Sequence, residues 1–370
     1  MHHLKWTIAI SLLLTACSTP SKQADETPKE ESVEASKTPE AQTSKTTPEP
    51  ALEVIAESKN QWTGVAASGA RVYVNYPRWS DNVPISVGYL DGEDVAPFPD
   101  ASWQTWQPGQ DFSQKFVAVQ SVVPGPEGSV WVLDTGNPGF QGVIEGAARL
   151  FRFDANGNKL DEIPFGDSAK PNSYTNDIRF DLENQRAYVT DSGAGGLFVI
   201  DLETKEIHRA LDAHPSVMAE DTTITIDGKP WLRGGNPPQV HTDGIALHDG
   251  WLYYQALTGR TLYRIPTELL ETTVEEATRT EAIETLAEVG PSDGLIAGPD
   301  GSIYLSSLES NAVRVYRPDG TIDTIAQDAR IAWPDSFSWT SEGDLLVTAS
   351  RIHQGGNPQG PYSILKIDLK

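Results

Sequence analysis

The pentapeptide Val130-Trp-Val-Leu-Asp134 is a short run of β-favouring apolar residues that ends in a polar side chain, and runs of the same kind recur along the chain. The other copies are Arg71-Val-Tyr-Val-Asn75, Ala187-Tyr-Val-Thr-Asp191, Trp251-Leu-Tyr-Tyr-Gln255, Ser302-Ile-Tyr-Leu-Ser306 and Asp344-Leu-Leu-Val-Thr348. Runs of this length and composition predict β-strands. Their recurrence indicates that one structural unit is repeated six times.

In each unit, further strands are predicted before and after this run. An apolar run and a hairpin-like turn, such as His248-Asp249-Gly250, precede it. An alternating strand follows at residues 85–90, 149–153, 197–201, 261–265, 312–316 and 363–368. A more polar strand is predicted at residues 159–164, 206–211, 282–289 and 321–326. Four strands repeated six times predict an all-β fold, a six-bladed β-propeller with four-stranded blades.

The last unit runs out of chain after its third strand. Residues 52–57 form a spare alternating strand just before the first unit. We expect this N-terminal strand to complete the last blade and close the ring, which would remove the exposed sheet edges that invite aggregation.

The first residues of the chain predict export. Residues 1–5 are basic, residues 6–14 are apolar, and Leu14-Thr-Ala-Cys17 resembles a bacterial lipobox, in which cleavage precedes a cysteine that is then acylated. An ordinary signal peptide with an incidental cysteine is the alternative. We therefore predict a lipoprotein signal peptide at residues 1–17, with lipidation at Cys17. The protein would be anchored in the cell envelope, in the outer membrane or at its periplasmic face if the host is Gram-negative.

Residues 18–50 contain mostly Thr, Pro, Glu, Lys, Ser and Ala, with almost no large apolar side chain. Such a segment cannot bury enough surface to offset its ordering entropy, so it predicts a disordered tether. The propeller would then occupy residues 51–370, and the membrane would be contacted only through the N-terminal lipid.

The charge balance limits the class of ligand. The chain of 370 residues has 52 acidic and 28 basic side chains, a formal net charge of −24. This balance argues against nucleic acid, because neutralising phosphates needs clustered Lys and Arg. It is compatible with metal ions or amines, or serves only solubility. The single cysteine excludes an intramolecular disulfide. We expect a monomer that binds a small molecule.

The residues just before the first strand of each unit would lie at the channel mouth. In order along the chain these positions are Thr63-Gly64, Gln120-Ser121, Asn176-Asp177, Thr242-Asp243, Ser292-Asp293 and Pro334-Asp335. We therefore predict a channel ligand site formed by Gln120, Asn176, Asp243, Asp293 and Asp335. Gathered carboxylates repel one another, so they need a cation, a shared proton or a cationic ligand. Among metals, hard oxygen ligands suit Ca²⁺ best.

Two alternatives apply to these positions. Asp-Gly and Asn-Asp pairs also form turns, so they could serve only to start strands. His241 adjoins Asp243 and is a weak candidate for a general base, and the sequence favours an ordinary surface or loop histidine over that role. Asp134-Thr-Gly136 and Asp191-Ser-Gly193 resemble aspartic-protease loops, but they recur at the blade interval, so repeat geometry accounts for them.

Several longer motifs resemble the Yellow/major-royal-jelly family. They include Trp62-Thr-Gly-Val65, Val74-Asn-Tyr-Pro-Arg-Trp79, Tyr188-Val-Thr-Asp-Ser-Gly193, Arg260-Thr-Leu-Tyr-Arg-Ile-Pro-Thr267 and Trp333-Pro-Asp-Ser-Phe337. The resemblance implies a six-bladed propeller whose channel holds a small aromatic or amine-like molecule. Insect members include dopachrome-converting enzymes, amine-binding salivary proteins and storage proteins, so the resemblance leaves enzyme and non-enzyme open. The cysteines of secreted insect members are missing here.

The chain more distantly resembles the calcium-dependent lactonases of the gluconolactonase/senescence-marker group, which are also six-bladed. That resemblance implies Asn176 and Asp243 as metal ligands and places Gln120 near a substrate-facing position. The first-blade glutamate of that group is missing, because Trp62-Thr63-Gly64 stands there.

Three functions remain open at this stage. The first is a ligand-binding or isomerase-like propeller, and the second is a Ca²⁺-dependent lactone hydrolase. The third is a non-enzymatic envelope module that binds protein through Trp62, Trp79, Trp103 and Trp106. Residues 91–112 and 213–240 are long segments that could close over the channel.

Overall fold

A computed structural model describes residues 51–80 and 83–369. The predicted signal peptide, Cys17 and the tether at residues 18–50 lie outside the described residues. Export, lipidation and the tether therefore stay predictions.

Six four-stranded antiparallel sheets form the described part of the chain, with one additional two-stranded sheet. The first three blades contain β2 (Gly64–Ser68), β3 (Arg71–Asn75), β4 (Val87–Asp91), β5 (Asp94–Pro97), β6 (Val119–Pro124), β7 (Val130–Asp134), β8 (Arg149–Phe153), β9 (Lys159–Pro164), β10 (Thr175–Asp181), β11 (Arg186–Asp191), β12 (Leu197–Asp201) and β13 (Ile207–Ala210). The last three contain β16 (Thr242–His248), β17 (Trp251–Ala256), β18 (Thr261–Pro266), β19 (Glu284–Glu288), β20 (Leu295–Ala297), β21 (Ile303–Ser307), β22 (Ala312–Tyr316), β23 (Ile322–Gln327), β24 (Pro334–Trp339), β25 (Leu345–Ala349), β26 (Tyr362–Ile367) and β1 (Leu52–Ser58).

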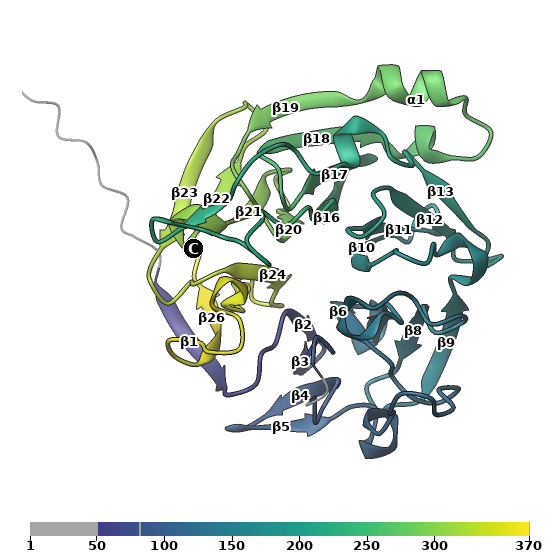
Figure 1. Ribbon diagram of the computed structural model, residues 1–370, viewed down its shortest axis with the longest axis vertical. Coiled ribbons are helices and arrows are strands. Elements are labelled where there is room, and N and C mark those ends of the chain that lie inside the picture. The colour runs from purple at the N-terminus through teal and green to yellow at the C-terminus, as the bar shows by residue number, and fades with distance from the viewer. Residues whose placement is uncertain (1–50, 81–82, 370) are drawn as a thin grey trace, which may run out of the picture. The chain divides into compact units, whose positions relative to one another are not determined.

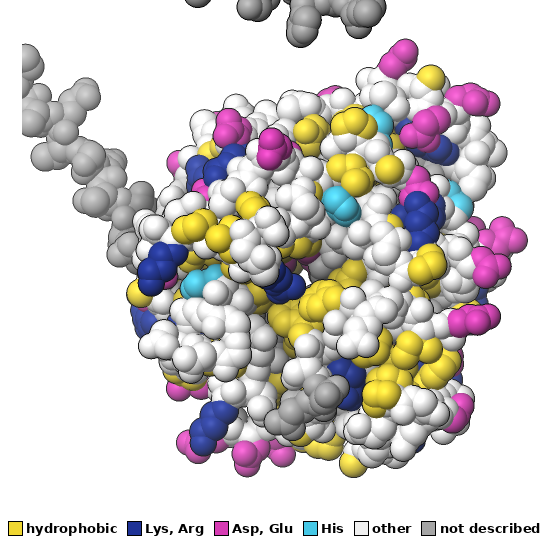
Figure 2. Space-filling view, in the orientation of Figure 1, with side chains coloured by type: hydrophobic (Ala, Val, Ile, Leu, Met, Phe, Trp, Pro, Cys, Tyr) yellow, Lys and Arg dark blue, Asp and Glu magenta, His cyan; other side chains and the backbone are white. Residues whose placement is uncertain are grey.

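The blades stand in a ring around a common centre (Figure 1). The first strand of each blade contacts the first strand of the next, and β24 of the last blade contacts β2 of the first. Figure 2 shows the same face with its side chains, and a hollow lies at the centre of the ring. The six-bladed propeller predicted from the sequence is confirmed.

The two ends of the propeller meet in one sheet. Strand β1 pairs antiparallel with β26, with Leu52 opposite Ile367 and Ser58 opposite Tyr362. The predicted closing strand, residues 52–57, is confirmed and is one residue longer than expected. The last blade thus combines three strands from the C-terminal end of the chain with one from residues 52–58.

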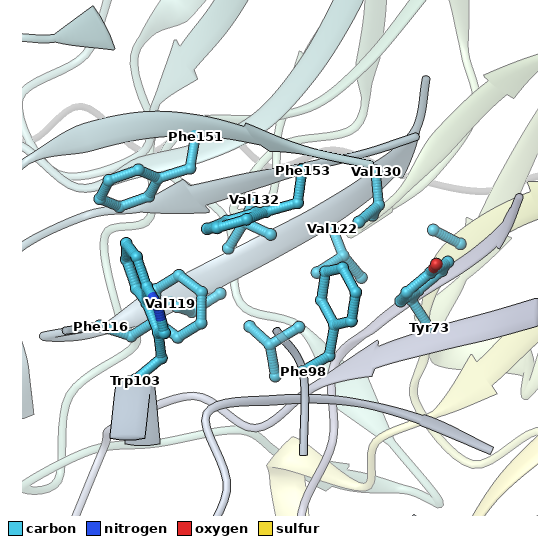
Figure 3. Close-up of a cluster of buried hydrophobic side chains, with 12 residues drawn as sticks. Tyr73, Phe98, Trp103, Phe116, Val119, Val122, Val130, Val132, Phe151 and Phe153 are labelled. Carbon is cyan, nitrogen blue, oxygen red and sulfur yellow. The ribbon is translucent and has the colours of Figure 1, made fainter. Parts of the chain in front are cut away.

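Aromatic side chains fill the space between neighbouring blades. Between the first two blades, Trp103 packs edge-on against Phe153, with ring centroids 5.1 Å apart, and Phe98 packs against Tyr73 at 4.9 Å (Figure 3). Trp103 comes from a 3₁₀ turn, η1 (Ala101–Gln104), inside the long segment 91–112. That segment also contains β5, so it belongs to the blade and to the interblade core.

A helix and a hairpin inserted between the repeated strands were not predicted from the sequence. Helix α1 (Glu276–Ala282) precedes β19, and a small hairpin of β14 (Thr225–Ile226) and β15 (Lys229–Pro230) lies within segment 213–240. Both lie outside the repeated four-strand unit, so the periodicity of the sequence did not predict them. No helix in the described ranges is long and apolar enough to cross a membrane.

The two motifs that resemble aspartic-protease loops, at Asp134 and Asp191, stabilise the fold, as their recurrence at the blade interval predicted. Strand β7 ends at Asp134, which is fully buried. Its carboxylate accepts hydrogen bonds from the backbone N–H groups of Val117 at 2.6 Å, Ala118 at 2.8 Å and Gly136 at 3.0 Å. In the next blade Asp191 accepts in the same way from Tyr174, at 2.9 Å. Each aspartate therefore fastens its blade to the segment that leads into the innermost strand.

Candidate functional site at the channel mouth

Glycines bring the innermost strands of three blades close together. A Cβ atom added to Gly294 would lie 2.0 Å from the carbonyl oxygen of Asp335, and one added to Gly244 would lie 2.5 Å from that of Asp293. No larger residue fits at either position without displacing the neighbouring backbone. The glycine of each Asp-Gly pair thus allows close approach between blades, and the preceding aspartates converge on the axis.

All five predicted channel residues line one cavity. Its volume is about 60 Å³, enough for a few water molecules or a small cationic head group. The lining includes Gln120, Asn176, Asp243, Asp293 and Asp335. The structure thus brings together the residues that the sequence placed in register, while their role toward a ligand stays a prediction.

A chain of hydrogen bonds links the polar groups of this cavity across four blades. The indole of Trp79 donates to the Tyr174 hydroxyl at 2.7 Å, and that hydroxyl donates to Oε1 of Gln120 at 2.8 Å. Gln120 donates to Oδ1 of Asn176 at 3.2 Å. Asn176 in turn donates from Nδ2 to Asp243 at 2.7 Å. The chain fixes the orientation of both amides and points the donor end of Asn176 at a carboxylate.

The three carboxylates are buried and electrostatically strained. Burial raises the pKa of Asp243 well above its ordinary value, and the charges of Asp293, Asp177 and Asp335 raise it further. Burial also raises the pKa of Asp335, with a further contribution from Asp293. The pKa of Asp293 rises to about 7 because burial outweighs the hydrogen bond from Trp333. Asp243 and Asp293 are hydrogen-bonded to each other. The cluster therefore retains protons near neutral pH unless a cation replaces them.

An ion pair lies next to this cluster on the innermost strand of the third blade. Nη2 of Arg179 lies 3.5 Å from Oδ2 of Asp177, and its guanidinium also donates to the carbonyl of Leu295 in the fifth blade. Ser121 of the second blade donates to Asp177 at 3.2 Å. Arg179 thus bridges two blades and supplies a positive charge beside the acidic cluster.

Aromatic rings form the outer wall of the cavity. Phe140 stacks between Trp79 and Tyr174, with centroid distances of 5.8 and 4.9 Å. On the opposite blades Trp231 packs edge-on against Trp333 at 4.7 Å. Figure 2 shows hydrophobic side chains bordering the central hollow. The cavity therefore combines acidic groups with an aromatic wall, the two features that attract organic cations.

Comparison with known proteins places this propeller in a family. A family model described as major royal jelly protein matches residues 125–363. The chain belongs to this family. It is 24% identical over 328 residues to Protein yellow of Drosophila guanche and 23% identical over 328 residues to Protein yellow of Drosophila melanogaster. These alignments cover 78% of this chain but only 55% and 58% of the relatives, so the chain spans little more than half their length.

Solved structures of low sequence identity share the fold. A gluconolactonase from Xanthomonas campestris has a TM-score of 0.54 at 13% identity, covering 86% of this chain and 89% of that chain. A virginiamycin B lyase from Staphylococcus aureus has a TM-score of 0.51 at 14% identity, covering 86% and 99%. At this identity the likeness shows the fold alone.

In this major royal jelly family member, two of the sequence-derived positions lie apart from the cavity. Nδ1 of His241 accepts a hydrogen bond of 2.9 Å from the backbone N–H of Ala219, and burial lowers the pKa of His241. Because His241 is not among the lining side chains, its place is that of a loop histidine. The hydroxyl of Thr63 accepts from Asn75 at 3.1 Å, also away from the lining.

The segments that flank the mouth differ in their roles. Residues 213–240 contribute Trp231, Arg233 and Val240 to the cavity wall, so this segment covers part of the mouth. Residues 91–112 contribute no lining side chain.

The prediction of a protein-binding face formed by four tryptophans is wrong, because Trp62, Trp103 and Trp106 are buried in the core. Trp79 alone of that set reaches the mouth.

The residues present do not complete a calcium site of the lactonase kind. No group of three or more His, Cys, Asp or Glu side chains in the described ranges is arranged to hold a metal ion. Asn176 directs its Nδ2 donor at Asp243, so its amide would have to turn over before Oδ1 could ligate a metal beside that carboxylate. The first blade offers Thr63 where the lactonase group has its glutamate. The donor set therefore suits a hydrogen-bonding cation better than Ca²⁺.

The aromatic residues of the wall were not predicted as site residues. Tyr174 and Trp333 lie two residues before Asn176 and Asp335, so the spacing that identified the polar positions also contained a signal for these rings. Trp231 and Arg233 come from segment 213–240, which has no counterpart in the other repeats, and nothing in the periodicity indicates them.

Proposed function

We propose that the channel mouth binds a small organic cation, an amine carried on an aromatic or other apolar body. The observation that supports this proposal is the meeting of Asp243, Asp293 and Asp335 in one cavity walled by aromatic rings. A bound ammonium group would take the place of the protons that the raised pKa values retain, and would relieve the repulsion among the carboxylates.

The size and chemistry of the cavity fit the charged end of such a ligand. An ammonium group offers up to three N–H donors, and the carboxylates supply acceptors. Its positive charge is also attracted to the faces of the surrounding rings, a contribution of about 0.5–2 kcal/mol per ring. The apolar body would then lie toward the open side, against Trp79 and Phe140.

An isomerase-like activity is the enzymatic form of the same proposal. The pKa of Asp293 is raised to about 7, mainly by burial, which suits a group that accepts and returns a proton near neutral pH. A bound molecule with an acidic C–H beside its cationic centre could then be tautomerised. Pure ligand binding needs the same contacts without the proton transfer.

Calcium-dependent lactone hydrolysis is the competing proposal. The fold shared with a gluconolactonase and the oxygen-rich cavity support it. The incomplete ligand set at Thr63 and the donor orientation of Asn176 disfavour it. Calcium would have to bind through Asp243 and its acidic neighbours.

Titration calorimetry of residues 51–370 with tryptamine and with Ca²⁺, together with thermal melting in the presence of Ca²⁺, tests these alternatives. We expect tryptamine to bind at pH 7.5 and Ca²⁺ to leave the melting temperature unchanged. Asp243→Asn should weaken tryptamine binding at least tenfold, because it removes the charge nearest Asn176. The matched control is Asp319→Asn, since Asp319 is an exposed turn residue remote from the channel. Binding of Ca²⁺ without binding of amines would overturn the proposal.

We also propose that the propeller is exported and held in the cell envelope by a lipid on Cys17. The support is the sequence of residues 1–17. In a bacterial host, the full chain should fractionate with membranes and Cys17→Ala should be released into the soluble fraction. Equal fractionation of both would reject the lipid anchor.

A further inference from the structure

A wider groove adjoins the acidic cavity. Its volume is about 480 Å³, and it shares four wall residues with the cavity, Trp79, Phe140, Arg233 and Ile352. A molecule whose charged end occupies the cavity of about 60 Å³ can therefore extend into the groove along the residues that line both.

The groove has the opposite electrostatic character to the cavity. Among its described lining residues the charged side chains are Lys59 and Arg233, and none is acidic. The cavity is lined instead by Asp243, Asp293 and Asp335. Arg233 lines both regions, so a ligand held by the carboxylates of the cavity also lies next to a positive charge.

Arg233 stands at the boundary between the two regions and is exposed, so its guanidinium is open to a ligand. The guanidinium carbon lies 5.4 Å from the ring centroids of both Phe140 and Trp231. No ion pair and no side-chain hydrogen bond join Arg233 to another residue in the part of the chain that the structure describes. Its backbone is fixed by reciprocal hydrogen bonds with Asn236. The two rings thus hold the guanidinium in place and leave its N–H edges for an acceptor.

A carboxylate is the natural acceptor for such an edge. The planar guanidinium presents paired N–H donors that match the two oxygens of a carboxylate, and aromatic stacking on its faces does not compete with them. Among the described residues that line the groove none is acidic, so a ligand carboxylate would meet Arg233 there without repulsion from them.

We propose that the ligand is a zwitterion, with an amine held by the carboxylates of the cavity and a carboxylate held by Arg233. This inference rests on the proposed function, because it assumes that the cavity binds an amine, and it adds the second charged group. Amino acids with an aromatic body carry both charges on one carbon, so their amine and carboxylate would lie side by side where Arg233 lines the acidic cavity.

The test compares two probes that differ by a single carboxylate, L-tryptophan and tryptamine. We expect wild-type protein to bind L-tryptophan about tenfold more tightly than tryptamine by calorimetry, the usual gain from one charge-assisted pair. In Arg233→Gln the order should reverse, since L-tryptophan loses its partner and tryptamine no longer meets a positive charge at the wall. Arg233→Lys should fall between, because it keeps the charge and loses the paired donors.

The outcomes separate the two proposals. Tighter binding of tryptamine than of L-tryptophan by the wild type, or an affinity ratio unchanged in Arg233→Gln, would overturn the zwitterion and leave amine binding intact. Failure of the wild type to bind either probe would overturn both. Equal melting temperatures of wild type and Arg233→Gln would exclude unfolding as the cause of any loss.

Discussion

The indole Nε1 of Trp333 donates a hydrogen bond of 2.6 Å to Oδ2 of Asp293, and this contact joins the aromatic wall of the channel to its acidic cluster. Trp333 is fully buried and also packs against Trp231. A donor aimed at a carboxylate favours the charged form and lowers its pKa. Trp333 therefore opposes the effect of burial, and with this hydrogen bond in place the pKa of Asp293 is raised to about 7.

The first prediction concerns this hydrogen bond. Trp333→Phe keeps a buried ring and removes the donor, so the pKa of Asp293 should rise. Because an amine binds the ionised cluster, the pH at which tryptamine binding is half-maximal should shift upward by about one unit. Calorimetry between pH 6 and 9 measures the shift. An unchanged pH profile with an intact fold would show that Asp293 does not control binding.

The second prediction concerns stability and pH. A carboxyl whose pKa is raised on folding binds more protons in the folded state than in the unfolded state between the two pKa values. For Asp293 that window runs from about 3.8 to about 7. The free energy of unfolding should therefore fall as the pH rises through this window, by on the order of 1 kcal/mol per unit for each such group.

Melting temperatures of residues 51–370 from pH 4.5 to 8 check this dependence. The general repulsion of an acidic protein also grows with pH, so Asp293→Asn is the necessary comparison. The variant should lose part of the slope and be the more stable protein at pH 8. A slope identical to that of the wild type would mean that Asp293 titrates normally.

The third prediction separates structural from functional aspartates. Asp134 accepts three backbone N–H groups, and Arg149 lies 4.0 Å away, at the limit of an ion pair. Asp134→Ala should lower the free energy of unfolding by about 2–4 kcal/mol, because it leaves three buried backbone donors without their acceptor, while Arg149 keeps Glu162 and the carbonyl of Lys115. Asp134→Asn should cost less, since it keeps one acceptor oxygen. Urea denaturation gives both values. If Asp134→Ala lowered the free energy of unfolding by less than about 1 kcal/mol, Asp134 would not be holding the blade to the segment before β6.

The fourth prediction concerns the ion pair of Asp177 and Arg179. Arg179→Met should destabilise the propeller by about 2–4 kcal/mol, because Asp177 loses its cationic partner and the carbonyl of Leu295 loses the guanidinium donor. Adding Asp177→Asn should recover part of the loss. A double-mutant cycle measures the coupling, which we expect to be at least about 1 kcal/mol. Strict additivity would show that the two charges act independently.

The repeated units allowed the fold to be predicted because each blade buries alternating residues in the same way. The runs at Val130–Asp134, Arg149–Phe153 and Lys159–Pro164 coincide with strands β7, β8 and β9. The fourth strand of the first blade, β5, was missed, because Asp94–Pro97 is short, ends in proline and has a weak alternation. Helix α1 was missed because it is an insertion outside the repeat.

The candidate site could be predicted only in its inner part. Asn176, Asp243 and Asp293 lie on strands or at strand starts, and the propeller geometry directs those positions at the axis. Phe140 and Arg233 reach the mouth from irregular segments whose path depends on tertiary packing, so no periodic signal marks them. The sequence also could not show that Asn176 would direct its donor at Asp243, since that orientation depends on the hydrogen bonds of Gln120 and Tyr174.

The pairing of β1 with β26 makes the order of synthesis matter. Strand β1 is the first described strand to leave the ribosome, and its partner is the last. Its hydrogen-bonding edge must stay unpaired while the rest of the propeller is made, and the ring cannot lock until the final residues arrive. A truncated chain would therefore keep an open sheet edge at each end, which leaves unfinished molecules exposed to proteolysis and to pairing with one another.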